Sequence, residues 1–393
     1  MRDVVYMAWR YLVYNRVKTT ILVLAIMLIV YLPAGLNVLV GQSAARLTAR
    51  AGATPLLVGA KGSAVELTLN SLYFDSGTPE LARYREAERI AESRLADAIP
   101  LYVRYRARGY PIVGTNIDYF DFRRLRLAAG RSMAVLGECV LGAAVAKDLG
   151  LEPGSSLVSS PENVFDLAGV YPLKMHVTGV LAPSFGPDDR AVFVDIKTTW
   201  IIEGLGHGHQ DLDEPAAASG VLSRDGRRIT ANASVVQYNE ITAENLDSFH
   251  FHGDFGDYPI SAVLAVPRDD RAGVILQGRY ENADAPAQIL RPGIVIDDLL
   301  ATVLTIRSFV VAAMLIVGSG TLVTVALVFL LSLRLRRREL ETLLKIGGAR
   351  SRVAAVLCTE VVVVLVLGAV LAAGLTGVTR RLGAEAIQRF ILS

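Results

Sequence analysis

The chain has 393 residues, of which 52% are hydrophobic, and a mean hydropathy of +0.41. Its 40 basic and 38 acidic residues leave a formal net charge of only +2. This composition is too apolar for an average soluble protein, and the apolar residues are concentrated in a few stretches. The two cysteines, Cys139 and Cys358, provide no disulfide framework.

Residues 1–20 are predicted to form a cytoplasmic amphipathic helix on the inner surface of a membrane. Val4, Ala8 and Leu12 recur there at helical spacing, and arginines occupy the other faces. Two interpretations stay open. The helix is either a simple interfacial anchor for the span that follows or a surface that touches a cytoplasmic partner.

Three stretches exceed the roughly 18 apolar residues that a membrane span needs. We predict transmembrane helices at residues 21–41, 306–333 and 353–378, the last with Glu360 as its one charged residue. The first stretch could instead be a signal peptide. Its length exceeds the usual apolar core of about 7 to 15 residues in such a peptide, so we favour an uncleaved anchor.

A basic segment at residues 334–352 separates the second and third spans, and seven of its nineteen residues are Lys or Arg. The positive-inside rule places this segment in the cytoplasm, together with the basic N-terminus. Residues 42–305 are then extracytoplasmic. The tail at residues 379–393 is also outside and is predicted to be an interfacial helix.

The external region is predicted to be an α+β domain with mixed strand pairing. Its predicted elements, in chain order, are a strand at 54–58, a helix at 79–98, strands at 102–113 and 138–141, a helix at 143–149, and strands at 175–181, 191–194 and 260–266. Between residues 202 and 255 the composition shifts to Gly, His, Asp and Ala, which indicates long loops or an insertion. The chain contains no Walker A, GxSxG or HExxH motif, so we do not expect an enzyme.

The basic segment also predicts a short amphipathic helix at residues 336–351. Leu340, Leu343, Leu344 and Gly347 fall at i, i+3, i+4 and i+7, and the pair Gly347-Gly348 ends the helix. Such a helix between two spans is typical of a docking element. The alternative is a solvated turn whose cations anchor the membrane.

The sequence RRRELETLLKIGGARSRVAAVLCTEVVVVLVLG at residues 336–368 resembles the signature of MacB/FtsX-like permeases of ABC transporters, a family that includes the LolC/LolE type. External segments at 113–131, 138–157 and 176–195 resemble the family's external core domain, and residues 8–20 resemble its N-terminal segment. The resemblance covers most of the chain apart from about residues 200–300. Lys345 replaces a small residue of the family pattern. Three spans stand where the family usually has four, which we interpret as a natural variant.

The resemblance implies an inner-membrane permease subunit whose residues 42–305 form a MacB-like periplasmic core domain, with a His-rich insertion around 203–257. A cytoplasmic ABC ATPase dimer, which uses ATP and Mg, is expected to grip the coupling helix of a permease homodimer. Closure of the ATPase dimer would move the external domain and thereby drive export or extraction of a substrate, a mechanism called mechanotransmission. The coupling residues implied are Arg337, Arg338, Glu339, Leu340, Leu343, Leu344, Lys345, Gly347 and Gly348.

The resemblance leaves the external partner open. It could be a periplasmic adaptor, a substrate-binding protein or a hydrolase. The alternative function is an FtsX-like regulator that transports nothing and activates a periplasmic cell-wall hydrolase. Membrane lipid is an expected partner. Nucleic acid is not, because the basic segment is flanked by spans. No catalytic cofactor is expected on this chain.

Glu360 lies within the third predicted span, where a carboxylate is a functional candidate by default. The other interpretation is an ion pair with Arg352 or Lys345 near the interface. Such a pair would orient the coupling segment.

Four of the five histidines form two His-x-His pairs, His207 with His209 and His250 with His252. Residues i and i+2 of an extended segment face the same side, so each pair could chelate a metal ion. Acidic residues accompany both pairs: Asp211, Asp213, Glu214, Asp254 and Asp257. Imidazoles and carboxylates are ligands for Zn, Ni or Cu, and we hypothesise zinc, for substrate capture, metal sensing or structural bracing. The alternative is two loops in which His is merely polar.

Overall fold

The computed structural model describes residues 2–74, 77, 79–160, 172–209, 221–225, 228–231, 238–281, 286–345 and 349–391. The chain divides into two compact units. The helical unit comprises Met1–Ala49 and Asp298–Ser393, and the sheet unit comprises Arg50–Asp297. The sheet unit is thus a continuous segment between two parts of the helical unit in the sequence.

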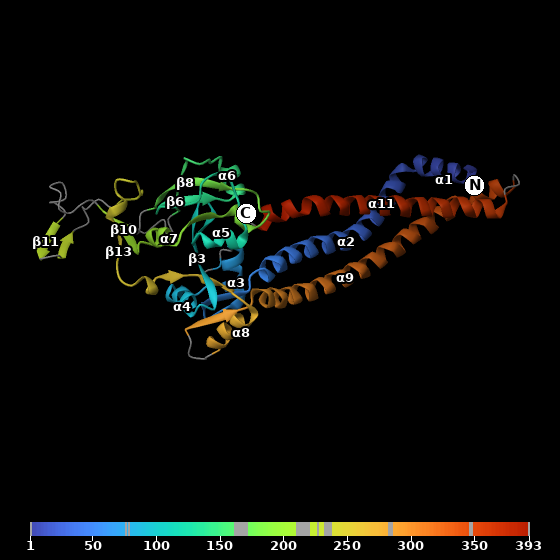
Figure 1. Ribbon diagram of the computed structural model, residues 1–393. Helices are drawn as coiled ribbons and strands as arrows, with labels where there is room; N and C mark the ends of the chain where they lie inside the picture. Colours follow the sequence, from blue (N-terminus) through green and yellow to red (C-terminus); the bar gives the residue numbers. More distant parts are fainter. Residues whose placement is uncertain are drawn as a thin grey trace. The chain divides into compact units, whose positions relative to one another are not determined.

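The helical unit is built from long helices (Figure 1). Its elements are α1 (Arg2–Tyr14), α2 (Arg16–Gly52), α9 (Pro292–Leu335), α10 (Arg337–Lys345) and α11 (Arg350–Ile391). Among the described residues, α2, α9 and α11 are long and apolar enough to cross a membrane, as judged by length and composition. All three predicted spans lie inside these helices. The 44 residues of α9 would measure about 66 Å, roughly twice the thickness of the hydrocarbon core of a bilayer.

The described part of the C-terminal tail, for which an interfacial helix is predicted, belongs to a longer helix. Helix α11 continues without a break from Arg350 to Ile391. The segment after Val378 contains no proline and, apart from Gly383, is rich in good helix formers, which is compatible with a continuous helix.

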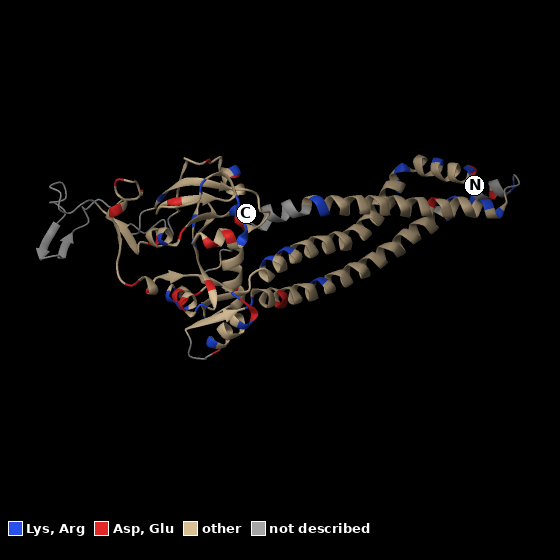
Figure 2. Cartoon of the chain, in the orientation of Figure 1, with Lys and Arg blue, Asp and Glu red and all other residues tan. Residues whose placement is uncertain are grey.

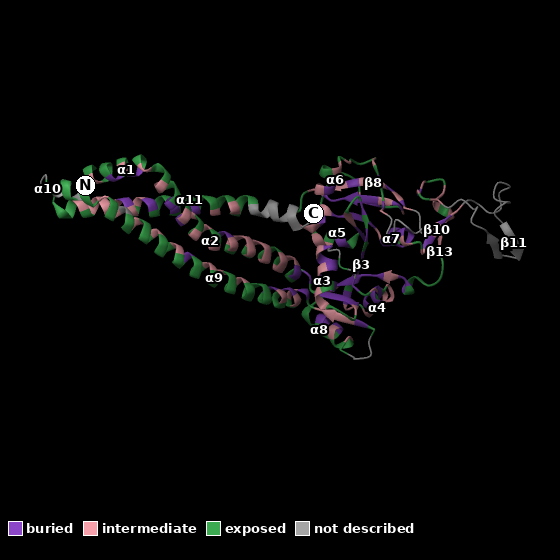
Figure 3. Cartoon of the chain, turned by 180° about the vertical axis from the view of Figure 1, so that it is seen from behind, coloured by how far each residue is buried: buried purple, intermediate pink, exposed green. Residues whose placement is uncertain are grey.

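Apolar side chains from three helices of the helical unit form a small core. Leu22, Val23 and Ile26 of α2 pack with Leu12 of α1 and Val364 of α11. Helix α11 can approach α2 closely at Gly368, where a Cβ atom would lie 2.7 Å from Cγ2 of Ile26. Most of α9, by contrast, is exposed along its length (Figure 3).

The sheet unit contains a ten-stranded mixed sheet in the order β16-β1-β15-β3-β4-β9-β6-β8-β5, with β7 paired to β8. Its strands are β1 (Leu56–Ala60), β3 (Ala96–Ala107), β4 (Tyr110–Thr115), β5 (Leu127–Gly130), β6 (Glu138–Leu141), β7 (Ser156–Val158), β8 (Lys174–Leu181), β9 (Val192–Asp195), β15 (Ala262–Pro267) and β16 (Ala287–Leu290). The pairs β4–β9 and β6–β8 are parallel and the other pairs are antiparallel. The predicted α+β class with mixed pairing is confirmed.

Helices and short ribbons complete the sheet unit. The helices are α3 (Ala64–Tyr73), α4 (Arg85–Ser93), α5 (Asp118–Arg123), α6 (Ala143–Leu149), α7 (Ile196–Glu203) and α8 (Asp270–Arg279), with 3-10 turns η1 (Pro187–Arg190), η3 (Leu246–Ser248) and η4 (Phe255–Asp257). Three two-stranded ribbons pair β2 (Ala82–Arg83) with β14 (Pro259–Ile260), β10 (Gly206–Gly208) with β13 (Phe249–Phe251), and β11 (Val221–Asp225) with β12 (Arg228–Ala231). The predicted insertion therefore contains two of the ribbons.

Two predicted elements are divided by turns. The single helix expected at 79–98 is β2, then α4, then the start of β3. The strand expected at 102–113 is interrupted by Arg108 and Gly109, which have positive φ angles of 48° and 86° and reverse the chain between β3 and β4. By contrast, β6 and α6 have the predicted bounds, and Gly150 caps α6 in the left-handed conformation.

The aromatic cluster around Trp200 fixes the elements that flank the insertion. Trp200 of α7 is fully buried, and its indole N–H donates to the carbonyl oxygen of Pro259 at 2.8 Å. The ring of Tyr258 lies 4.9 Å from that of Trp200, and the ring of Phe255 lies 5.9 Å from it. Because α7 leads directly into β10, and β13 leads into Phe255 and Tyr258, both strands of one ribbon start from this core.

Candidate functional site

Strands β10 and β13 form an antiparallel ribbon, named here the histidine ribbon, with two chemically different faces. His207 lies opposite His250, Gly206 opposite Phe251 and Gly208 opposite Phe249. Side chains alternate between the two faces of a ribbon, so the imidazoles share one face and the phenyl rings the other. The alternation follows from the sequences GHGH and FHFH.

The phenyl face attaches the histidine ribbon to the core of the sheet unit. Phe249 and Phe251 pack against the main apolar cluster, and the ring of Phe251 lies 5.4 Å from that of Phe255. Gly206 and Gly208 are required opposite these rings. A Cβ atom at Gly206 would lie 2.5 Å from the ring of Phe251, and one at Gly208 would lie 2.6 Å from the ring of Phe249. The phenyl rings thus occupy the space that larger residues would need.

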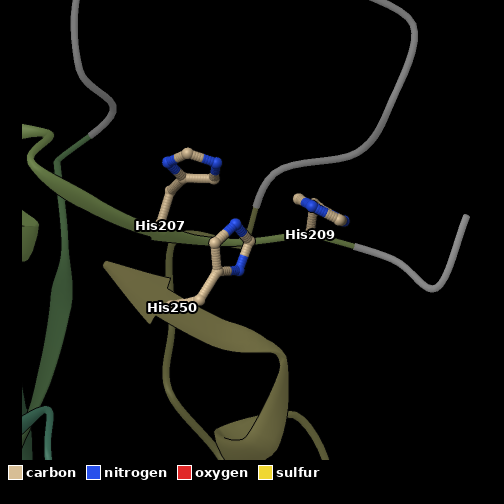
Figure 4. A group of neighbouring side chains, drawn as sticks. All are labelled: His207, His209 and His250. Carbon is tan, nitrogen blue, oxygen red and sulfur yellow. The ribbon is translucent and has the colours of Figure 1, made fainter. Parts of the chain in front are cut away.

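The imidazole face brings the predicted ligands together (Figure 4). The coordinating nitrogens of His207, His209 and His250 lie within 4.8 Å of one another. The ring of His252 lies 4.8 Å from that of His250 and 5.2 Å from that of His207. The three grouped imidazoles are half-buried and His252 is exposed. The two His-x-His pairs, which are distant in sequence, therefore meet.

Hydrogen bonds fix two of these histidines. Nδ1 of His250 lies 2.9 Å from the carbonyl oxygen of Ser248. A carbonyl only accepts, so Nδ1 is the donor and Nε2 is the nitrogen left to coordinate a metal ion. The Tyr258 hydroxyl accepts from the backbone N–H of His252 at 3.1 Å and donates to its carbonyl at 2.8 Å. Burial, and then the neighbouring imidazoles, lower the pKa of His207, which favours the neutral ring.

The acidic residues near the second pair face arginines. Asp254 pairs with Arg85 at 2.7 Å, and Asp257 pairs with Arg83 at 2.8 Å. A hydrogen bond from the backbone N–H of Gly256, followed by one from Arg85, lowers the pKa of Asp254. These two carboxylates are thus engaged away from the imidazoles. The other three predicted acidic residues, Asp211, Asp213 and Glu214, lie outside the described residues.

The predicted coupling segment forms a helix, α10, and Lys and Arg gather around it and the neighbouring ends of α9 and α11 (Figure 2). Arg337 is 82% exposed and pairs with Glu341 at 3.0 Å along the helix, and Arg338 and Lys345 are also exposed. Four further predicted residues lie on this helix: Glu339, Leu340, Leu343 and Leu344. Gly347 and Gly348 lie outside the described residues.

Glu360 is buried and pairs with Arg336, not with the predicted Arg352 or Lys345. Nη1 of Arg336 lies 3.3 Å from both carboxylate oxygens. The Arg336 guanidinium also stacks on the ring of Tyr11 in α1, 3.4 Å from its centroid. Arg352 lies eight residues before Glu360 on the same helix, about 12 Å along the axis, which is too far for a direct pair. The partner comes instead from the turn between α9 and α10.

A third cluster, which the sequence analysis missed, surrounds Arg50 in the sheet unit. Arg50 donates from Nη1 to Asp188 at 2.6 Å and from Nη2 to the Tyr119 hydroxyl at 2.9 Å, and its Nε donates to the carbonyl of Leu72. Tyr119 in turn donates to Asp188 at 2.7 Å. Burial opposes ionisation of Asp188, but the charge of Arg50 and hydrogen bonds from Arg50 and Tyr119 outweigh it and lower the pKa of Asp188.

Comparison with known proteins identifies the family. The family described as MacB-like periplasmic core domain matches residues 20–244, more than half of the chain. The match continues past residue 200, where the resemblance was expected to stop. No curated protein matches the chain.

Two solved structures are similar over most of their own length. The periplasmic region of MacB from Actinobacillus actinomycetemcomitans is 10% identical, with 63% of this chain and 93% of that chain covered and a TM-score of 0.35. The extracellular domain of the noncanonic ABC-type transporter YknZ from Gram-positive bacteria is 12% identical, with 60% and 98% covered and a TM-score of 0.32. Since both TM-scores are low, the assignment rests on the family match. The chain belongs to the MacB/FtsX-like family of ABC transporter permeases, through its MacB-like periplasmic core domain.

Proposed function

We propose that this chain is the permease subunit of an ABC transporter and couples ATP hydrolysis by a separate cytoplasmic ATPase to movement of its external domain. The observation that carries the proposal is the position of α10. This short charged helix lies between two candidate membrane spans and presents exposed Arg337 and Arg338. An ATPase that grips α10 acts on a segment that is tied to other helices.

Arg336, the residue that directly precedes α10, connects this helix to α11 and α1. It pairs with the buried Glu360 of α11 and stacks on Tyr11 of α1. Separating a buried charge from its partner typically costs about 3–5 kcal/mol, so a displacement of α10 is transmitted to α11 and α1 and does not dissipate in a loose turn. The three helices then form the element that ATP binding biases between two states.

Helical connections support transmission to the external domain. The chain passes between the units at residues 49–50, inside α2, and at residues 297–298, inside α9. A helix transmits a shift along its axis better than a flexible loop does. At the end of α2, the buried contact of Arg50 with Asp188 fixes the helix within the sheet unit. Movement of α2 would therefore move the sheet.

The exposed surface of α9 supports a homodimer within lipid. This helix is the least buried of the three candidate spans. Phe309, Ile316 and Val317 are among its large apolar side chains, with exposures of 71%, 72% and 70%. Lipid and a second copy of the chain would cover them. We propose two permease copies with two ATPase subunits, acting in export or extraction of a substrate from the outer side of the membrane.

Co-purification tests this function. The tagged full chain is isolated from membranes of its host in mild detergent, and an ABC ATPase with measurable ATP hydrolysis is expected in the eluate. The variant R337E/R338E reverses two exposed charges of α10 and should lose the ATPase. The matched control R380E/R381E makes the same change at two exposed arginines of α11. Absence of an ATPase from the unaltered chain, or equal retention by both variants, would refute the proposal.

A further inference from the structure

We propose that the histidine ribbon binds one divalent transition-metal ion, Zn²⁺ in the first instance, through His207, His209 and His250, with His252 as the fourth ligand. This site goes beyond the proposed transport function and does not depend on it.

The spacing of the ligands suits closure on a small ion. A tetrahedral zinc ion with Zn–N bonds of about 2.0–2.1 Å holds its nitrogens roughly 3.3 Å apart. The nitrogens of the three grouped histidines now lie within 4.8 Å of one another. His207 and His250 are directly paired and His209 follows β10, so we expect rotation of these half-buried side chains to close the difference.

The two faces of the histidine ribbon have different roles: the phenyl face attaches it to the core, and the imidazole face is available to bind a metal ion. Its phenyl face packs on the core, through Phe249 and Phe251, so the imidazoles are not needed for packing. The glycines opposite the phenyl rings make this arrangement possible. A rigidly anchored face that presents several imidazoles outward is a preorganised ligand set.

The ligand chemistry selects the class of ion. Neutral imidazoles suit Zn²⁺, Cu²⁺ and Ni²⁺, whereas Ca²⁺ and Mg²⁺ require oxygen ligands. The nearby carboxylates Asp254 and Asp257 pair with Arg85 and Arg83 and do not convert the site into one for hard cations. Of the ions in this class, Zn²⁺ accepts a tetrahedral set of nitrogens without geometric preference of its own.

A hydrogen bond to the backbone already orients one ligand, His250. The Ser248 carbonyl takes the Nδ1 proton of His250 and leaves Nε2 as the coordinating atom. Metal-bound histidines nearly always make such a bond with their other ring nitrogen.

A bound ion would join the two ends of the insertion. Each strand of the ribbon has only three residues, and an isolated two-stranded ribbon is marginally stable. Coordination by residues of both strands adds its binding free energy to the folded form of the ribbon. The bound ion would thus hold together β10 and β13, the two strands that flank residues 210–248 in the sequence.

Zinc binding to the purified full chain tests the site. A C358S background removes the exposed thiol as a competing ligand, and zinc is titrated against a chromophoric chelator. We expect one Zn²⁺ per chain. H207A and H250A should each weaken binding by at least ~100-fold, because even the loss of a residue that only hydrogen-bonds to a metal ligand costs 10- to 100-fold. H252A should weaken it by about tenfold, in line with a more exposed ligand.

The control is His176, which lies on β8, outside the histidine ribbon, and pairs with Glu240. H176A removes an equal side chain and should bind zinc normally. Unfolding of each variant in the absence of metal separates loss of a ligand from loss of the fold. With Co²⁺, the unaltered ribbon should give the intense visible absorption of a tetrahedral site. Failure to bind zinc, or unchanged affinity in both H207A and H250A, overturns the proposal, and unchanged affinity in H252A overturns the fourth ligand.

Discussion

The guanidinium of Arg50 forms a buried ion pair with the carboxylate of Asp188, with 2.6 Å between Nη1 and Oδ2. The two side chains are 12% and 4% exposed. Arg50 belongs to the last turn of α2, and Asp188 belongs to the turn η1 of the sheet unit, 138 residues later. The pair therefore joins the last turn of α2 to η1 within the sheet unit.

Replacing Asp188 by Asn should destabilise the sheet unit strongly. The Arg50 charge would stay buried without a counter-charge, which typically costs about 3–5 kcal/mol. Denaturant unfolding of the full chain in detergent measures the loss. The control is Asp257→Asn, which breaks a pair whose side chains are 50% and 69% exposed and should have little effect. Equal losses of unfolding free energy in D188N and D257N would show that burial of the Arg50–Asp188 pair does not determine its contribution to stability.

The same pair predicts the acid sensitivity of the domain. The folded-state pKa of Asp188 is lowered, so its contribution is present above the usual aspartate value, about 3.9, and is lost as the pH falls through the lowered value. The difference in Tm between the unaltered chain and D188N should be constant near neutral pH and shrink below about pH 4. A difference that grows with acidity would contradict this assignment.

Glu360→Gln should uncouple ATP hydrolysis from the external domain. The change leaves Arg336 half-buried without its counter-charge, so α10 is no longer fixed to α11. We expect at least a tenfold loss of transport per ATP hydrolysed, which corresponds to about 1.4 kcal/mol of the lost interaction. Vesicles with the reconstituted complex provide both rates.

Two further variants make the Glu360 test specific. The exchanged pair R336E/E360R should recover part of the coupling, since the two side chains still carry charges of opposite sign and attract each other. Arg352→Gln removes an exposed cation of the same segment and should couple normally. Normal coupling in E360Q would exclude the ion pair from the mechanism.

Gly206→Ala should loosen the histidine ribbon without removing a ligand. Its Cβ atom would lie 2.5 Å from the ring of Phe251, so the phenyl ring must move and the strand must shift with it, at a cost of about 1–3 kcal/mol. The free energy of unfolding and the zinc affinity should both fall. Gly278→Ala is the control, because its Cβ meets nothing within 4 Å. If both alanine variants behave alike, the phenyl face does not anchor the ribbon.

Features that depend on local sequence could be predicted. The three long helices follow from apolar stretches with few charged residues that are longer than a bilayer requires. Helix α6 follows from its short pattern and the glycine at residue 150, which takes the left-handed conformation that ends a helix. The parallel and antiparallel pairs of the sheet, however, could be predicted only as a mixture.

Features that depend on packing between distant segments could not be predicted. His207 and His250 are 43 positions apart, and only the register of β10 on β13 brings them together. The partner of Glu360 depends on which face of α11 meets the turn after α9, and the sequence offered several nearby cations. Arg50 gave no signal at all, because a lone arginine at a helix end is usually solvated.

Strand β3 has a consequence for how the external domain can be divided. Its first half, Ala96 to Leu101, pairs with β15, and its second half, Tyr102 to Ala107, pairs with β4. The two parts of the ten-stranded sheet thus share one uninterrupted backbone. Cutting the sheet unit at β3 would separate the strands on the β15 side from those on the β4 side and leave each part with an open edge, so we expect the unit to fold only as one piece.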